Sequence, residues 1–454
     1  MRIPRALTVA GSDSGGGAGI QADLKTFAAL GVHGMSAITS ITAQNTYQVT
    51  RVVDLDPDMV VEQIRVCVED IGVDSIKTGM LHTSEIIRAV ASELKKIGVP
   101  VVVDPVMVAK SGAPLLKPDA IESLKSELLP VAAVVTPNAR EAERLCGFEV
   151  RSVEDQARAA KEIARMGCRT VVVKGGHVQG PKVVDVVYHE GEVVKLEGER
   201  LESKNTHGTG CAFASAIAAH LAHGREVVEA VRLAKEFVAD AIRHGLDFGR
   251  GAGPINPSWS TLRKALLLES CENVRAAAEY LESVDGAGVL CPESMINLAE
   301  VVPFGERIED VVGLPGRIVR VGNKLRVSSC PMPGGSKHLA SAVLTAHSFD
   351  KRFRAAMNVR FDEGIVEAAR HLGLSVSSYD RSKEPPSIKA IEGMTIRWGV
   401  SEAFKAAGRV TDIIYHKGDF GKEPMILILG SDAIDVVKKF HNIFNRYFSQ
   451  KTKE

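Results

Sequence analysis

The sequence has no excess of charge of either sign. Its 56 lysines and arginines equal its 56 aspartates and glutamates, so no net charge favours binding to nucleic acid or to an anionic membrane. No apolar run approaches the ~20 residues that a membrane-spanning helix needs, and the run that begins at Ala6 is too short for the core of a signal peptide. We therefore expect a cytoplasmic protein without a nucleic-acid or membrane partner.

Cysteine is sparse, and its spacing fits neither a redox pair nor a metal site. The seven cysteines form no C-x-x-C pair and show no metal-ligand spacing, which is typical of a reducing compartment. The 454 residues include 45% hydrophobic and 25% charged side chains, as in soluble globular proteins. This length predicts two or three domains of about 150 residues each.

A glycine-rich loop, Gly11–Gly19, lacks the lysine of the Walker A phosphate-binding motif, because Gly17 stands where that motif requires it. A relaxed dinucleotide-binding fingerprint fits from Gly17 onward, but no acidic residue ends a second strand about 20 residues later. The glycines instead indicate that the backbone approaches a small ligand closely. Asp13 and Asp23 flank the loop, and each would bind that ligand or cap a helix.

Short apolar segments alternate with amphipathic helices in the first half of the chain. The expected strands are residues 6–10, 36–42, 75–80, 99–103, 131–135 and 170–173, and the expected helices include residues 57–71 and 83–97. This alternation predicts an α/β fold with a mainly parallel sheet covered by helices on both faces. Ligands bind such sheets at the carboxyl ends of the strands. Six polar residues follow these strands and indicate an enzyme: Gln44, Asp104, Asn138, Glu141, Lys174 and His177.

The segment Asn205–Ala219 predicts an anion-binding site. Gly208 and Gly210 flank Thr209, and Cys211 then opens an alanine-rich helix. The free N–H groups of a helix start favour an anion such as phosphate. A thiol at a helix start has a lowered pKa, so Cys211 is a candidate general base. The alternative is a plain glycine-entry helix with a buried cysteine.

Two interpretations also fit the segment that begins at Thr136. Thr136 and Pro137 are a typical N-cap and first helical residue, and Glu141 suits the first helical turn. Capping alone would explain these residues. Alternatively, Asn138 and Glu141 form an N-x-x-E pair that holds Mg²⁺ through water molecules against a triphosphate. Lys174, after a buried strand, would neutralise a phosphate or simply end the strand in solvent.

As a set and in this order, seven motifs of residues 1–258 resemble the hydroxymethylpyrimidine/phosphomethylpyrimidine kinases of thiamine biosynthesis, a branch of the ribokinase-like fold. The motifs are GSDSGGGAGIQADLKTF, AQNT, KTGML, VDPVM, TPNAREAE, VKGGH and NTHGTGCAFASAIAA. The resemblance implies that ATP and Mg²⁺ phosphorylate a pyrimidine alcohol and then its monophosphate. Most ribokinase relatives carry Asp where this chain has Cys211, which favours pyrimidine kinases over sugar kinases. Pyridoxal kinases remain an alternative, and a homodimer is expected.

The resemblance also assigns roles to individual residues. The catalytic residues are Gly208, Gly210 and Cys211, which form an anion hole, and Cys211 is also the base. The pyrimidine-binding residues are Gly11, Asp23, Gln44 and Met80. We expect the nucleotide to contact Asn138, Lys174 and Thr209, and the metal to be held by Asp104 and Glu141.

The second half predicts a smaller α/β domain. Residues 247–263, rich in Gly, Pro and Ser, indicate a linker. The expected elements are helices 265–281, 294–302 and 432–448, a strand at 425–429, and a hairpin of residues 317–321 and 324–327 around Gly322-Asn323. Ser336 is a suitable N-cap for a further helix, in whose first turn Lys337 and His338 oppose the helix dipole unless an anion binds there. An exposed, solvent-screened pair is the alternative.

A D-x-x-K-E-P pattern occurs twice, at Asp380–Pro385 and Asp419–Pro424. It either forms turns or places acidic and basic groups beside one ligand.

Residues 266–450 resemble a thiamine-phosphate synthase domain, and we assign this domain to residues 259–454. The resemblance lies in the stretches GRIVRVGNKLRV, GGSKHLASAVL, YDRSKEP and KGDFGKEPMI. This implies coupling of the pyrimidine diphosphate to thiazole phosphate, and the residues expected to act are Arg320 and His338 in catalysis and Lys337, Asp380, Arg381 and Lys422 in substrate binding. A catalytically inactive domain that senses thiamine phosphate is the competing hypothesis.

Overall fold

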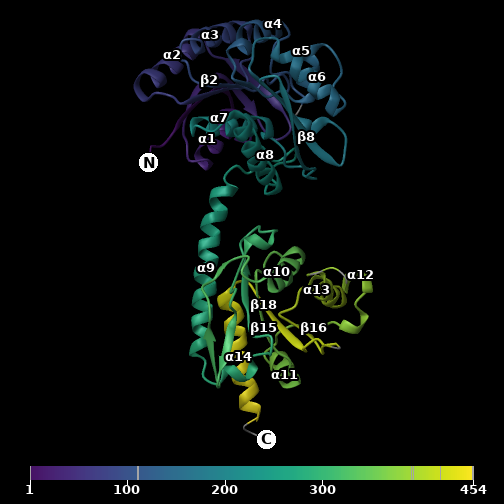
Figure 1. Cartoon of the computed structure of the whole chain (residues 1–454). Coiled ribbons are helices and arrows are strands. Elements are labelled where there is room, and N and C mark those ends of the chain that lie inside the picture. The colour runs from purple at the N-terminus through teal and green to yellow at the C-terminus, as the bar shows by residue number, and fades with distance from the viewer. Residues whose placement is uncertain (1, 110–111, 390, 392, 420, 452–454) are drawn as a thin grey trace. The chain divides into compact units, whose positions relative to one another are not determined.

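The computed structural model describes residues 2–109, 112–389, 391, 393–419 and 421–451 (Figure 1). The chain divides into two compact units, Met1–Thr261 and Leu262–Glu454, here called unit 1 and unit 2. Within the described residues, no helix combines the length and the apolar character that crossing a membrane requires.

Unit 1 is built on a nine-stranded sheet in the order β3-β2-β1-β4-β5-β6-β7-β8-β9. The strands are β1 (Arg5–Asp13), β2 (His33–Gln44), β3 (Val49–Asp54), β4 (Ser75–Thr78), β5 (Val101–Val103), β6 (Val134–Val135), β7 (Thr170–Val173), β8 (Lys182–His189) and β9 (Glu192–Glu199). The six strands from β2 to β7 in this order run parallel, whereas β3, β8 and β9 pair antiparallel. The predicted mainly parallel sheet is confirmed.

Helices cover both faces of this sheet, as predicted (Figure 1). On one face lie α2 (Pro57–Val66), α3 (Ser84–Leu94), α4 (Ala120–Ser123), α5 (Ala139–Cys146) and α6 (Val153–Ala164), and on the other lie α1 (Gly19–Ala29), α7 (Thr209–Ala222) and α8 (Val227–Arg243). Helix α2 continues as a wider π-helical turn, Cys67–Ile71, so the predicted helix 57–71 is one continuous element with a change of pitch. The alanines of α7 are buried, which lets α1 and α8 approach it closely.

Unit 2 contains a seven-stranded sheet in the order β14-β11-β10-β15-β18-β17-β16, and a separate hairpin β12-β13. The strands are β10 (Leu298–Val301), β11 (Val311–Gly313), β12 (Ile318–Val321), β13 (Lys324–Val327), β14 (Met332–Pro333), β15 (Ala355–Arg360), β16 (Val376–Ser378), β17 (Ile413–His416) and β18 (Met425–Gly430). The predicted hairpin is confirmed. Only β16 and β17 pair in parallel among the strands that the structure describes in this sheet.

The helices of unit 2 pack on both faces of its sheet. On one face lie α9 (Trp259–Ser283), α11 (Glu363–His371) and α14 (Ala433–Lys451), and on the other lie α10 (Lys337–Phe349) and α13 (Met394–Ala407). The second α/β domain is therefore confirmed, with a mainly antiparallel sheet.

Two predicted elements of the second half are wrong in type or extent. The predicted helix 294–302 is strand β10, whose four residues are all buried. A short segment that is buried on every side fits a central strand. Its burial shows no helical periodicity, which would leave one face exposed. The predicted linker 247–263 ends in helix, because α9 already begins at Trp259, where the indole stacks on His244 at 3.9 Å between ring centroids.

Candidate active site

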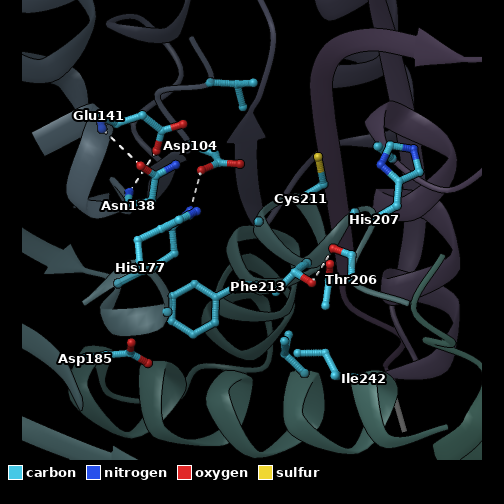
Figure 2. Close-up of a pocket in the computed structure, with 18 of the residues that line it drawn as sticks. Asp104, Asn138, Glu141, His177, Asp185, Thr206, His207, Cys211, Phe213 and Ile242 are labelled. Atoms are coloured by element: carbon cyan, nitrogen blue, oxygen red, sulfur yellow. Dashed lines mark hydrogen bonds and ion pairs between the residues drawn. The ribbon is translucent and has the colours of Figure 1, made fainter. Parts of the chain in front are cut away.

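A pocket of about 1230 Å³ opens in unit 1 at the carboxyl ends of its parallel strands. Its lining comes from the ends of β1, β2 and β4, from the segments after β5 and β7, and from the start of α7. Figure 2 shows the polar side chains that converge there from these elements. The topology thus brings together segments that are nearly 200 residues apart in sequence.

The start of α7 has the predicted form of an anion-binding site. Gly208 is the N-cap in the left-handed region (φ 84°), and a Cβ there would lie 1.8 Å from the carbonyl oxygen of Gly17, so only glycine fits. Gly210 lies beside Asp104 and Lys174. A Cβ on it would lie 3.4 Å from both the Asp104 carboxylate and the Lys174 ammonium. Thr209 also lines the pocket and donates its hydroxyl proton to the carbonyl of Thr206 at 2.7 Å.

Cys211 is half-buried, and it lines the pocket between the glycine loop and the strand ends (Figure 2). Burial raises the pKa of its thiol to about 11, although Lys77 acts in the opposite direction. The predicted lowered pKa is therefore wrong for the protein without ligand. Cys211 lies in the first turn of α7, where the partial positive charge of the helix start acts, but desolvation of the thiol outweighs that effect.

A charged cluster lies opposite the start of α7. The Lys174 ammonium is 3.1 Å from a carboxylate oxygen of Asp104, and this oxygen also accepts a hydrogen bond from Thr136 at 3.3 Å. Burial raises the pKa of Glu141 to about 7, with Lys174 opposing and Asp104 adding to the rise. Burial would lower the pKa of Lys174, but Asp104 and Glu141 raise it. The two carboxyl groups and one ammonium thus form a cluster in which the charge of each depends on the others.

Asn138 and Glu141 form a complete capping box at the start of α5. The backbone N–H of Glu141 donates to the Asn138 side chain at 3.0 Å, and the backbone N–H of Asn138 donates to the Glu141 carboxylate at 2.8 Å. The capping interpretation is therefore correct. Both residues also line the pocket, so capping fixes their positions there and leaves further oxygen lone pairs for a ligand.

At the other end of the pocket, Gly11, Gln44 and Met80 line it as predicted. A Cβ on Gly11 would lie 3.2 Å from the sulfur of Met80, so the glycine permits close contact between these strand ends. The side-chain oxygen of Gln44 accepts a hydrogen bond from Thr42 at 3.3 Å. This arrangement directs the amide NH₂ of Gln44 away from Thr42.

His207 and Asp13 form a pair that the sequence analysis did not include. Nε2 of His207 is 2.9 Å from a carboxylate oxygen of Asp13, which requires Nε2 to carry the proton. The amide nitrogen of Gln44, 3.5 Å from the same Nε2, therefore has no acceptor there and remains available to a ligand. Burial alone would raise the pKa of Asp13. His207 and the N–H groups of Gly15 and Ala18 have the larger combined effect, and the pKa is lowered overall. The presence of His207 within the motif that contains Cys211 was the available signal.

Asp23 does not reach the pocket, contrary to its predicted contact with the pyrimidine. Its side chain is completely buried, and it forms an ion pair with Lys77 at 2.8 Å. Lys77 lines the floor of the pocket in its place. Sequence position alone could not distinguish a carboxylate in the pocket from one directly beneath it.

The pocket continues along α8 and β9, where apolar, basic and acidic side chains line it. Figure 2 shows Phe213 and Ile242 here, with Asp185 and His177 toward the strand side. Asp185 forms an ion pair with Lys235 at 2.6 Å. Arg200 also lines this part, together with Glu197 and Glu236, so it carries charges of both signs.

In unit 2, five of the six predicted residues lie at one end of the seven-stranded sheet. The register places Gly313, Met425, His416 and Ser378 at this end. The loops and helix start that adjoin these positions carry five of the predicted residues, and the sixth, Arg320, lies in strand β12 of the separate hairpin. The six residues are Arg320, Lys337, His338, Asp380, Arg381 and Lys422. Within the described part of unit 2, no hydrogen bond or ion pair joins any two of these six side chains. Asp380 accepts hydrogen bonds from Ser382, which is the turn chemistry left open by the sequence. Phe420, in the second D-x-x-K-E-P pattern, lies outside the described residues.

Comparison with known proteins identifies both units. The family model described as phosphomethylpyrimidine kinase matches residues 13–256, and the model described as thiamine-phosphate synthase ThiN matches residues 273–442. The chain is 49% identical over 257 residues to a hydroxymethylpyrimidine/phosphomethylpyrimidine kinase of Streptomyces coelicolor, covering 57% of this chain and 95% of the relative. It is 49% identical over 251 residues to the thiamine biosynthesis bifunctional protein ThiED of Geobacter sulfurreducens, covering 55% of this chain and 51% of that protein.

Among solved structures, an ADP complex of Bacillus subtilis pyridoxal kinase aligns with a TM-score of 0.54 and 42% identity, covering 57% of this chain and 98% of that chain. The predicted ribokinase-like fold of unit 1 is thereby confirmed. Because the kinase model matches more than half of its residues, the chain belongs to the phosphomethylpyrimidine kinase family, and it carries a thiamine-phosphate synthase domain after the kinase domain.

Proposed function

We propose that unit 1 phosphorylates hydroxymethylpyrimidine and then its monophosphate with ATP, and that unit 2 couples the resulting diphosphate with thiazole phosphate to give thiamine phosphate and pyrophosphate. The observation that carries the kinase proposal is the position of Cys211. Its thiol lies in the pocket between Gln44 and Met80 on one side and the Asp104–Lys174 pair on the other. An acceptor alcohol and a phosphate chain would therefore meet at the start of α7.

The transfer step needs positioning and charge neutralisation more than covalent catalysis. After the Cys211 thiol has released its proton to solvent, the thiolate takes the hydroxyl proton of the acceptor, whose oxygen forms a bond to the γ-phosphorus of ATP. The bond from the γ-phosphorus to its bridging oxygen breaks, and ADP leaves with that electron pair. The N–H groups of Gly210 and Cys211, at the start of α7, would donate to the transferred phosphoryl group.

The residues opposite α7 suit a nucleotide with its metal ion. Lys174 would neutralise phosphate oxygens, with Asn138 and Thr209 beside it. Mg²⁺ keeps several waters and uses one or two carboxylates together with substrate phosphates, so Asp104 and Glu141 fit it, although the described residues contain no group of three or more His, Cys, Asp or Glu that could hold an ion. When bound, the ion would screen the negative charge of the phosphates.

Two further properties belong to this proposal. A homodimer is supported by apolar side chains exposed along the β2–β3 edge of unit 1, where Ile41 and Val53 are each about half exposed. A cytoplasmic location is supported by the seven cysteines, all of them free, since free thiols persist in reducing compartments.

The test uses the purified full-length chain with ATP, Mg²⁺ and hydroxymethylpyrimidine, and follows products by mass spectrometry. We expect the monophosphate, then the diphosphate, and thiamine phosphate only after thiazole phosphate is added. Pyridoxal is assayed in parallel, because the pyridoxal kinase structure is 42% identical to unit 1. Phosphorylation of pyridoxal alone would contradict the pyrimidine proposal, and diphosphate without thiamine phosphate would favour a sensor role for unit 2.

A further inference from the structure

A buried ion pair lies directly beneath the pocket, and neither of its residues has a role in the transfer step described above. Lys77, in β4, has no solvent exposure, yet it lines the floor of the pocket. A Cβ on Gly79 would lie 2.7 Å from the Lys77 ammonium, so the chain needs glycine there to let the ammonium fold back over the end of the strand. The ammonium therefore lies at the carboxyl end of β4, below the reacting groups.

Asp23 holds this ammonium from the side opposite the pocket. One oxygen of its carboxylate accepts hydrogen bonds from Lys77 at 2.8 Å and Thr8 at 2.6 Å, and the other accepts one from Ser215 at 2.6 Å. Ser215 follows Cys211 by one turn of α7. The carboxylate thus fixes the ammonium and the helix that carries the thiol relative to each other.

Packing alone does not account for this pair. An apolar side chain of similar volume is often at least as stable as a buried ion pair, and the strands around it bury apolar side chains such as Leu7, Ile76 and Val103. The charged groups that act on the Cys211 thiol are Lys77, Asp23 and Asp104, together with Lys174, which is bound to Asp104. Of these, Lys77 has the largest effect.

We propose that Lys77, held by Asp23, is a positioning residue for Cys211: its ammonium favours the thiolate and the negative charge that develops on the acceptor oxygen. This inference rests on the proposed kinase function. It replaces the predicted contact of Asp23 with the pyrimidine by an indirect role through Lys77.

The experiment measures how fast iodoacetamide alkylates Cys211 in the full-length chain at pH 8, without nucleotide. Cys330, which is exposed, serves as the reference within each sample, and peptide mass spectrometry quantifies both thiols. Removing one neighbouring opposite charge moves a pKa by at least about one unit, so Lys77→Met should slow alkylation of Cys211 relative to Cys330 by about tenfold or more. Lys77→Arg should restore a rate close to that of the unchanged protein.

Two further variants keep the result interpretable. Lys77→Met combined with Asp23→Asn removes both charges, so no unpaired carboxylate stays buried if the single variant does not fold. Because Lys77 lowers the pKa of the Cys211 thiol and Asp23 raises it, with Lys77 the larger effect, the double variant should show a smaller loss than Lys77→Met. Arg65→Met breaks an ion pair with Glu93 in unit 1, outside the pocket lining, and should change nothing. In kinetics, Lys77→Met should lower kcat and leave the KM for the pyrimidine nearly unchanged.

An unchanged alkylation rate in Lys77→Met would overturn the proposal, as would, if that variant does not fold, a rate in the double variant equal to or above that of the unchanged protein. An equal loss in Arg65→Met would also overturn it, because the effect would then follow general destabilisation. The alkylation result does not depend on turnover. If the chain failed to phosphorylate the pyrimidine, the proposed function would fail while the coupling of Lys77 to Cys211 could still be read.

Discussion

Replacing Glu141 by glutamine should remove a pH dependence of the stability of unit 1. The carboxyl group is buried, and it takes part in the capping box of α5 through an oxygen that accepts the Asn138 N–H. Glutamine has the same shape and keeps an oxygen acceptor, so Glu141→Gln preserves the cap. What it removes is the ionisable group beside Asp104 and Lys174.

The magnitude follows from the raised pKa. Burial moves the pKa of Glu141 from its ordinary value of 4.5 to about 7 in the folded protein. A raised pKa means that the folded state binds the proton more tightly than the unfolded state does. The stabilisation is therefore fully present below pH 4.5 and is lost as the pH rises through 7. At about 1.4 kcal/mol for each pKa unit, the loss in the free energy of unfolding is about 3 kcal/mol.

Urea unfolding at pH 5, 6, 7 and 8, without nucleotide or metal, measures this loss. The chain has two tryptophans, and Trp398→Phe leaves only Trp259, which is buried in unit 1 against His244. Its fluorescence then reports unit 1 separately from unit 2. Other titrating groups are common to both proteins, so the difference between Glu141→Gln and its parent isolates Glu141. If the difference in the free energy of unfolding between Glu141→Gln and its parent stayed constant across this pH range, the reasoning would be refuted.

Three further variants test the assigned roles. Cys211→Ala should lower kcat of the kinase by about 100-fold or more, the range of a lost general base, whereas Cys67→Ala, outside the pocket, should leave steady-state turnover unchanged. Gln44→Ala should raise the KM for the pyrimidine about tenfold, since one hydrogen bond is worth about 1 kcal/mol or slightly more; an unchanged KM in initial-rate assays would contradict its role. His338→Ala should abolish thiamine phosphate in the coupled assay and leave diphosphate formation intact.

Parallel strands such as β5 could be predicted because they are short apolar runs. Residues 101–103 are three valines, all buried, and only a strand covered on both faces makes such a run stable. The antiparallel strands β3 and β9 were not predicted. Each mixes exposed and half-buried residues and has no fully buried one, and in so short a stretch this pattern also fits a loop.

The candidate site could be predicted as far as topology determines it. Gln44, Asp104 and Lys174 lie in one pocket because the ends of parallel strands meet at one edge of the sheet. The pair of Asp13 and His207 could not be predicted, because 194 residues separate its members and no local pattern joins them. The state of Cys211 also depends on burial, which the sequence shows only indirectly.

Asp23 illustrates this limit most clearly. An aspartate after a glycine-rich loop has the same sequence context whether it faces a ligand or a neighbouring lysine. What decides between the two is where a cation lies in the folded chain, because a buried carboxylate needs donors on every side. Lys77, Thr8 and Ser215 supply those donors, and the completely buried Asp23 carboxylate is out of reach of an acceptor in the pocket. Its influence on the reaction must therefore pass through the ammonium of Lys77. Removing that ammonium in Lys77→Met tests whether the ion pair only stabilises the fold or also acts on the Cys211 thiol.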